Sequence, residues 1–99
     1  MTYGLSRDDM CYFAQSYTDQ GIFKTDPFNV LDVEGVGQLI KTACENGIRT
    51  NRTLGLSVCG EHGGDPASIN FFNSMKLNYV SCSPFRITIA KLAAAQANL

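Results

Sequence analysis

Hydrophobic residues recur at helical spacing in two stretches of the first half of the chain. The first stretch predicts a helix that Ser6 caps and Gly21 ends, with Asp8 and Asp9 near the positive end of its dipole. The apolar face of this helix comprises Met10, Phe13, Ala14 and Tyr17. A loop follows at residues 24–28, because Pro27 disfavours helical geometry at the residue before it.

The second stretch predicts an amphipathic helix that starts after Asp32, a candidate N-cap, and stops at Gly47. Its apolar stripe comprises Val36, Leu39, Ile40, Ala43 and Cys44. We expect this stripe to face a core, with Cys44 as a small buried hydrophobic residue.

The second half of the chain shows one pattern twice: a short apolar strand, a turn with a cysteine, and a capped helix. Residues 54–59 predict a buried strand, and the helix after it starts with Asp65 as N-cap and Pro66 in its first turn. Residues 79–82 predict a second strand, and Ser83 and Pro84 start the last helix. On the first of these helices, Ile69, Phe72 and Met75 are expected to point inward. On the last helix, one apolar face comprises Phe85, Ile89, Leu92 and Ala93.

This βαβα order predicts two parallel strands with about four helices, an α/β fold. Parallel sheets are buried on both faces and are rarely this small. We therefore expect a part of a larger α/β domain, such as a (β/α)8 barrel, and exposed apolar surface where the rest would pack. In such barrels, functional residues lie at the carboxyl ends of strands, here at residues 59–65 and 81–83.

Composition narrows the function classes. The 99 residues are 44% hydrophobic, which indicates a globular chain of one domain at most, with residues 1–99 as a single part of such a domain; the net charge of −1 disfavours nucleic acid as a partner. No apolar run is long enough for a membrane span, and the first residues do not resemble a signal peptide. The 4 cysteines are then expected to be reduced thiols of a cytoplasmic protein, with an organelle left open.

Residues 59–66 hold the densest group of reactive side chains. Cys59, Glu61, His62 and Asp65 lie among three glycines, which allow a ligand to approach the backbone. A thiol serves as a nucleophile when ionised and as a general acid when protonated. Less favoured interpretations are a polar turn, a zinc site of Cys59, His62 and Cys82, a Cys59–His62 hydrolase dyad, and phosphate binding at the helix N-termini.

The same residues carry a family resemblance. Cys-Gly-Glu-His-Gly-Gly-Asp-Pro at 59–66, Asn-Tyr-Val-Ser-Cys-Ser-Pro-Phe-Arg at 78–86 and the helix at 89–97 resemble the C-terminal end of the pyruvate, phosphate dikinase family of PEP-utilising enzymes. Blocks at 1–4, 6–9, 26–28 and 35–40 agree, so the resemblance covers essentially the whole chain.

The resemblance implies that this chain is about the last quarter of a (β/α)8 barrel. In the family, this barrel binds pyruvate or phosphoenolpyruvate with Mg²⁺. It implies a reaction that interconverts ATP, pyruvate and phosphate with AMP, phosphoenolpyruvate and diphosphate. Cys59 would be the proton donor and acceptor at the pyruvate methyl group, with Glu61, His62 and Cys82 as substrate-pocket candidates. It also implies a homodimer of the complete enzyme.

Parts of the family pattern are not among these 99 residues. The metal-binding block is expected just upstream of Met1, so no metal ligand is assigned in this chain, and ATP would bind through absent domains. Thr88 stands where the family has proline, and Ser57 where it has glycine. We expect the isolated chain to be inactive; the alternative function is a non-catalytic barrel remnant or interaction module that folds only with a partner or as an oligomer.

Overall fold

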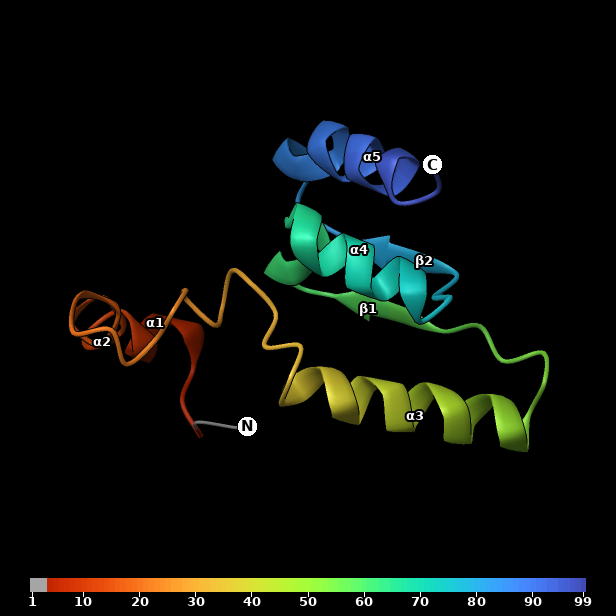
Figure 1. The fold of residues 1–99 in the computed structure, drawn as a ribbon, viewed down its shortest axis with the longest axis horizontal. Helices are drawn as coiled ribbons and strands as arrows, with labels where there is room; N and C mark the ends of the chain where they lie inside the picture. Colours follow the sequence, from red (N-terminus) through yellow and green to blue (C-terminus); the bar gives the residue numbers. More distant parts are fainter. Residues whose placement is uncertain (1–3) are drawn as a thin grey trace.

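The computed structural model describes residues 4–99, in which helices surround a small parallel sheet (Figure 1). The elements in chain order are α1 (Arg7–Met10), α2 (Ala14–Asp19), α3 (Val36–Thr50), β1 (Ser57–Cys59), the 3-10 helix η1 (Glu61–Gly64), α4 (Pro66–Ser74), β2 (Tyr79–Ser81), the 3-10 helix η2 (Pro84–Arg86) and α5 (Ile87–Gln96). Among these residues, no helix is both long and apolar enough to cross a membrane.

The two strands are parallel, as the βαβα pattern predicts. Ser57 lies opposite Tyr79, Val58 opposite Val80, and Cys59 opposite Ser81. Asn78 joins the strands where they begin: its backbone N–H donates to the carbonyl of Leu56 (2.9 Å), and its side-chain oxygen accepts from the Leu56 N–H (2.7 Å). Both strands are shorter than predicted, with regular pairing confined to three residues each.

Helix α4 connects the strands and begins as predicted. Pro66 is its first residue, and the Asp65 carboxylate accepts a hydrogen bond from the Ser68 N–H at 2.8 Å. Ile69 and Phe72 are buried, which confirms their inward direction, and Met75 is half-buried at the end of the helix. Figure 1 shows α4 alongside the strands, between α3 and α5.

Helix α5 packs on α4 through its alanines. The buried cluster between them consists of Ile69, Ala90 and Ala93. Ala93 belongs to the predicted apolar face, whereas the rest of that face is exposed, Phe85 by 94%, Leu92 by 61% and Ile89 by 44%, which agrees with the exposed apolar surface expected of a part of a larger domain. Small alanines let the two helices approach closely, which turns the larger apolar side chains outward. Ser83 is followed by η2, and its side chain makes no capping hydrogen bond.

Helix α3 is the longest, and both of its predicted ends are wrong. Its N-cap is Gly35; Asp32 instead accepts the Gly35 N–H at 3.0 Å in the preceding turn. The helix passes through Gly47, where a side chain would come within 2.9 Å of Leu54 Cδ2. The missing side chain lets the following loop return along the helix. Val36, Ile40 and Cys44 are half-buried, whereas Leu39 and Ala43 of the predicted stripe are exposed.

The N-terminal segment forms two short helices instead of the single predicted one. Ser6 caps α1 by accepting the Asp9 N–H at 3.2 Å, as expected. The backbone leaves helical geometry at Phe13 (φ −134°), whose ring packs edge-on against Tyr17. Of the predicted apolar face, Met10 is buried, Phe13 and Ala14 are half-buried, and Tyr17 is exposed.

Candidate functional site

The carboxyl ends of β1 and β2 lie side by side. The register places Cys59, the last residue of β1, opposite Ser81, the last residue of β2. The carboxyl ends of parallel strands lie at the same edge of a sheet, and functional residues of α/β folds are concentrated at that edge. Residues 59–65 and 81–83, the predicted site segments, therefore lie together at this edge.

The two cysteines of this region have different surroundings. Cys59 is exposed, whereas Cys82 is half-buried and packs against the cluster of Ile69, Ala90 and Ala93. Both thiols are free, as are those of Cys11 and Cys44. Of the two cysteines at the carboxyl end of the sheet, Cys59 is therefore the more exposed.

Glycines allow the chain to turn directly after Cys59. Gly60 has φ 129°, a conformation that L side chains rarely adopt, and the next four residues form the 3-10 helix η1. Gly63 is buried against β2, and a Cβ atom there would clash with the carbonyl oxygen of Ser81. A Cβ atom on Gly64 would lie 2.8 Å from Cβ of Arg86. The two glycines thus bring the loop after β1 against the end of β2 and the start of α5.

His62 connects this loop to the N-terminal half of the chain. Its Nε2 atom lies 2.8 Å from the carbonyl oxygen of Pro27. A carbonyl only accepts, so Nε2 donates and carries a proton. Asp26 fixes the Pro27 turn by accepting the Phe28 N–H at 2.9 Å. The predicted loop at 24–28 is therefore ordered around the site.

A second hydrogen bond holds the same segment to α4. The hydroxyl oxygen of Ser68, which is 1% exposed, accepts the Leu31 N–H at 3.0 Å. The same hydroxyl donates to the Asp65 carboxylate at 2.5 Å. Ser68 is thus satisfied in both directions, as a buried hydroxyl needs to be.

The loop and this segment border a small hollow of about 420 Å³, lined by Asp8, Phe28, Gly60, Glu61 and His62. The hollow unites two predicted site residues, Glu61 and His62, and adjoins Cys59 through Gly60. Cys59 and Cys82 do not line it. Sequence reasoning did not name Asp8 or Phe28 as site candidates, although both lie in blocks that agree with the family.

The described residues do not assemble a metal site. Within residues 4–99, no three His, Cys, Asp or Glu side chains come together as metal ligands. Two carboxylates, those of Asp8 and Glu61, line the hollow. The zinc hypothesis likewise lacks a ligand group in this part of the chain, and Asp65 serves as a helix cap.

Comparisons with known proteins identify the family. The sequence model for the PEP-binding domain of PEP-utilising enzymes matches residues 1–99. The chain is 59% identical over 96 residues to a chloroplastic pyruvate, phosphate dikinase from Flaveria pringlei, covering 97% of this chain and 10% of that protein. It is 57% identical over 98 residues to pyruvate, phosphate dikinase from Rickettsia typhi, and 58% over 98 residues to that from Rhizobium meliloti, each covering 99% of this chain and 11% of the relative.

The chain therefore belongs to the PEP-utilising enzymes, and the resemblance to pyruvate, phosphate dikinases is confirmed. Its two parallel strands and their helices are part of the family's PEP-binding domain. The chain spans about a tenth of the length of the curated relatives it matches.

Proposed function

We propose that residues 1–99 are the part of a pyruvate, phosphate dikinase barrel that contributes Cys59 as proton donor and acceptor at the pyruvate methyl group. One observation carries the proposal: Cys59 is the exposed thiol at the shared carboxyl edge of two parallel strands, directly before the loop that lines the hollow. The identity of 57–59% to dikinases supports the same reaction class.

The proposed step is a single proton transfer. In the direction of phosphoenolpyruvate formation, the Cys59 thiolate takes a proton from the pyruvate methyl group. The electron pair of the broken C–H bond forms the enol double bond, and the carbonyl oxygen becomes the nucleophile. This oxygen would accept the phosphoryl group from a phosphohistidine of another domain, which ATP phosphorylates, so that the P–N bond breaks and the histidine leaves. In the reverse direction, the thiol returns the proton to the same carbon. A thiol can both accept and donate a proton, so one group can serve both directions.

Glu61 and His62 are proposed to shape the substrate pocket. Both line the hollow beside Gly60, and the hydrogen bond from His62 to Pro27 holds the loop in place. Cys82 is the weaker candidate because it packs against helix residues. Mg²⁺, bound by residues outside this chain, would stabilise negative charge on the enolate oxygen when present.

The remaining proposals concern the complete enzyme. ATP would react at domains other than this one, and the enzyme would work as a homodimer in the cytoplasm or an organelle. The matched relatives include chloroplastic and bacterial proteins.

The test replaces Cys59 by alanine in the full-length protein that carries this chain. We expect methyl-proton exchange of pyruvate to fall by about 10²- to 10⁴-fold, the usual contribution of a general acid–base group. Phosphorylation of the protein by ATP should persist, because it needs no proton transfer at pyruvate. Exchange is measured by NMR in deuterated water, and phosphorylation with labelled ATP.

Cys11→Ala is the matched control, because Cys11 is also exposed but follows α1 at the other end of the chain. It should retain exchange. Near-normal exchange in Cys59→Ala would remove Cys59 from the mechanism and turn attention to Cys82.

The alternative, an interaction module without activity of its own, has a specific observation in its favour. Large apolar side chains of η2 and α5 are exposed, Phe85 by 94% and Leu92 by 61%, and they resemble a surface made to be covered. For the purified 99-residue chain, we expect no phosphoenolpyruvate from ATP and pyruvate under either proposal. Detectable product would contradict the expectation.

A further inference from the structure

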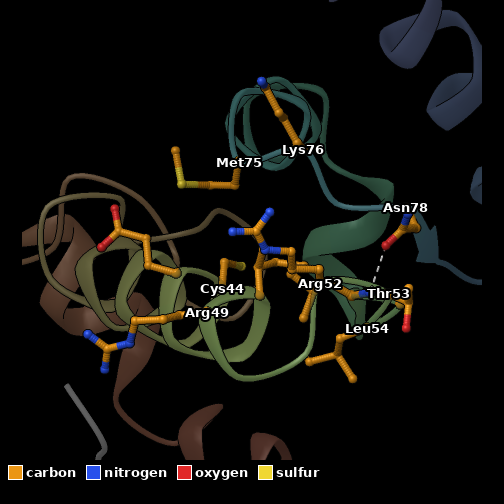
Figure 2. A pocket seen from close by; sticks show the side chains of 12 residues that line it. Cys44, Arg49, Arg52, Thr53, Leu54, Met75, Lys76 and Asn78 are labelled. Carbon is orange, nitrogen blue, oxygen red and sulfur yellow. Dashed lines mark hydrogen bonds between the residues drawn. The ribbon is translucent and has the colours of Figure 1, made fainter.

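A second hollow lies at the opposite end of the strands from Cys59. It has a volume of about 960 Å³ and is bordered by the last turns of α3, the loop before β1 and the turn after α4 (Figure 2). Asn78, whose side chain accepts the Leu56 N–H, forms one wall. This volume is at the upper end of the range for small-molecule sites, roughly 300–1,000 Å³. The hollow plays no part in the proposed proton transfer.

The interior of this hollow is mainly apolar. Its lining includes Cys44, Ile48, Leu54, Leu56 and Met75. Figure 2 shows Met75 and Cys44 on facing helices, with the guanidinium of Arg52 between them. A ligand with an apolar or aromatic body would therefore contact both helices and displace water from these side chains.

The charges around the hollow are mainly positive. Arg49, Arg52 and Lys76 line it, and none of the three side chains forms a hydrogen bond or an ion pair within residues 4–99. Glu45, the acid in the lining, is 4.0 Å from Lys41 on the same helix. The lining thus holds three cationic side chains and one carboxylate, and that carboxylate has Lys41 beside it. This excess of positive charge favours the binding of an anion. Arginine in particular binds phosphate through two parallel N–H donors.

We propose that this hollow binds a small amphipathic anion, an aromatic or apolar body that carries a phosphate, with Arg52 as the central anion ligand. Arg49 and Lys76 at the rim add attraction over a longer range. A different role for the arginines, to balance the negative C-terminal end of α3, would need no ligand. If the arginines bind a ligand, an anion should protect side chains inside the hollow from chemical modification. If they only balance the helix end, it should not.

Cys44 supplies a local readout, because it lines the hollow and its thiol is free and half-buried. The probe is 1-naphthyl phosphate, and the full-length protein that carries this chain is treated with iodoacetamide, a neutral reagent. We expect alkylation of Cys44 to slow about tenfold at a probe concentration ten times its Kd, by simple mass action. Mass spectrometry of the Cys44 peptide measures the rate, and exposed Cys11 should react unchanged.

Arg52→Gln removes the central cation, and we expect it to abolish most of the protection. Lys91→Gln, on exposed α5 outside the hollow, is the matched control and should retain it. Slow alkylation of Cys82, which packs against the buried cluster, verifies that each variant is folded. 1-Naphthol and inorganic phosphate, the two halves of the probe, should each protect less.

Three results would overturn the proposal: no protection of Cys44 at any soluble probe concentration, equal protection in Arg52→Gln, or equal protection by neutral 1-naphthol. Equal slowing at Cys11 would count against it too, because it would show an unspecific effect of the probe. Each of these readouts is independent of catalysis, so loss of activity at Cys59 leaves the result interpretable.

Discussion

The ends of β1 and β2 resemble each other in sequence and differ in surroundings. Each strand leads to a cysteine, a short 3-10 turn and an α-helix. After β1, the thiol of Cys59 is exposed and the following loop lines a hollow. After β2, Cys82 packs among Ile69, Ala90 and Ala93. The same local pattern thus leaves one cysteine exposed and the other half-buried against the helices.

The difference arises from the residues that succeed each cysteine. Gly60, with φ 129°, turns the chain away from Cys59, and buried Gly63 and Gly64 seat the loop against β2 and η2. After Cys82, Ser83 and Pro84 lead almost directly into α5, whose alanines cover the thiol from the other side. Glycines therefore free the first thiol, and helix packing encloses the second.

The largest expected structural effect comes from Gly63→Ala. The new Cβ would clash with the backbone carbonyl of Ser81, which cannot move without disturbing β2. We expect the loop to lose about 3 kcal/mol of local stability, typical of a buried clash, so amide exchange across residues 59–65 accelerates roughly a hundredfold. Hydrogen-exchange mass spectrometry of the full-length protein measures this.

Gly55→Ala is the matched control, because a Cβ at Gly55 meets nothing within 4 Å. It should leave exchange at 59–65 unchanged. If Gly63→Ala also left it unchanged, the close contact between the two strand ends would be disproved.

The next effect is the difference in reactivity between the two thiols. We expect iodoacetamide to alkylate Cys59 at least about tenfold faster than Cys82, because exposure governs access of the reagent. Mild urea should raise the rate at Cys82 and leave that at Cys59 nearly unchanged. Equal rates in the native protein would erase the distinction between the two ends.

The regular parts of this fold and the positions of both strand ends could be predicted from the sequence. The parallel pairing, the Asp65 cap and the inward Ile69 and Phe72 follow from short-range patterns, which a local sequence carries. The break at Phe13 and the continuation through Gly47 depend on distant contacts, such as that between Gly47 and Leu54. The spacing of hydrophobic residues along a helix contains no information about residues that contact it from elsewhere in the chain.

The sequence names Cys59, Glu61 and His62 as candidates by their chemistry, but not the residues that surround them. Cys59, Glu61 and His62 stand out by residue type, and the family motif covers them. The partner of His62 is the backbone carbonyl of Pro27, an atom that every residue possesses. Similarly, the exposure of Phe85 depends on which neighbours α5 meets, and helical spacing alone places it only on one face with Ile89 and Leu92.

The smallest expected effect concerns the two helix starts. Asp65→Ala removes the carboxylate that accepts the Ser68 N–H and hydroxyl, and loss of such a cap costs about 1 kcal/mol. Amide exchange in the first turn of α4 should then accelerate roughly fivefold. Ser83→Ala should change exchange at the start of α5 little, because the Ser83 side chain makes no capping hydrogen bond. Hydrogen-exchange mass spectrometry of both variants compares the two starts directly, and equal acceleration would show that Ser83 caps its helix as Asp65 does.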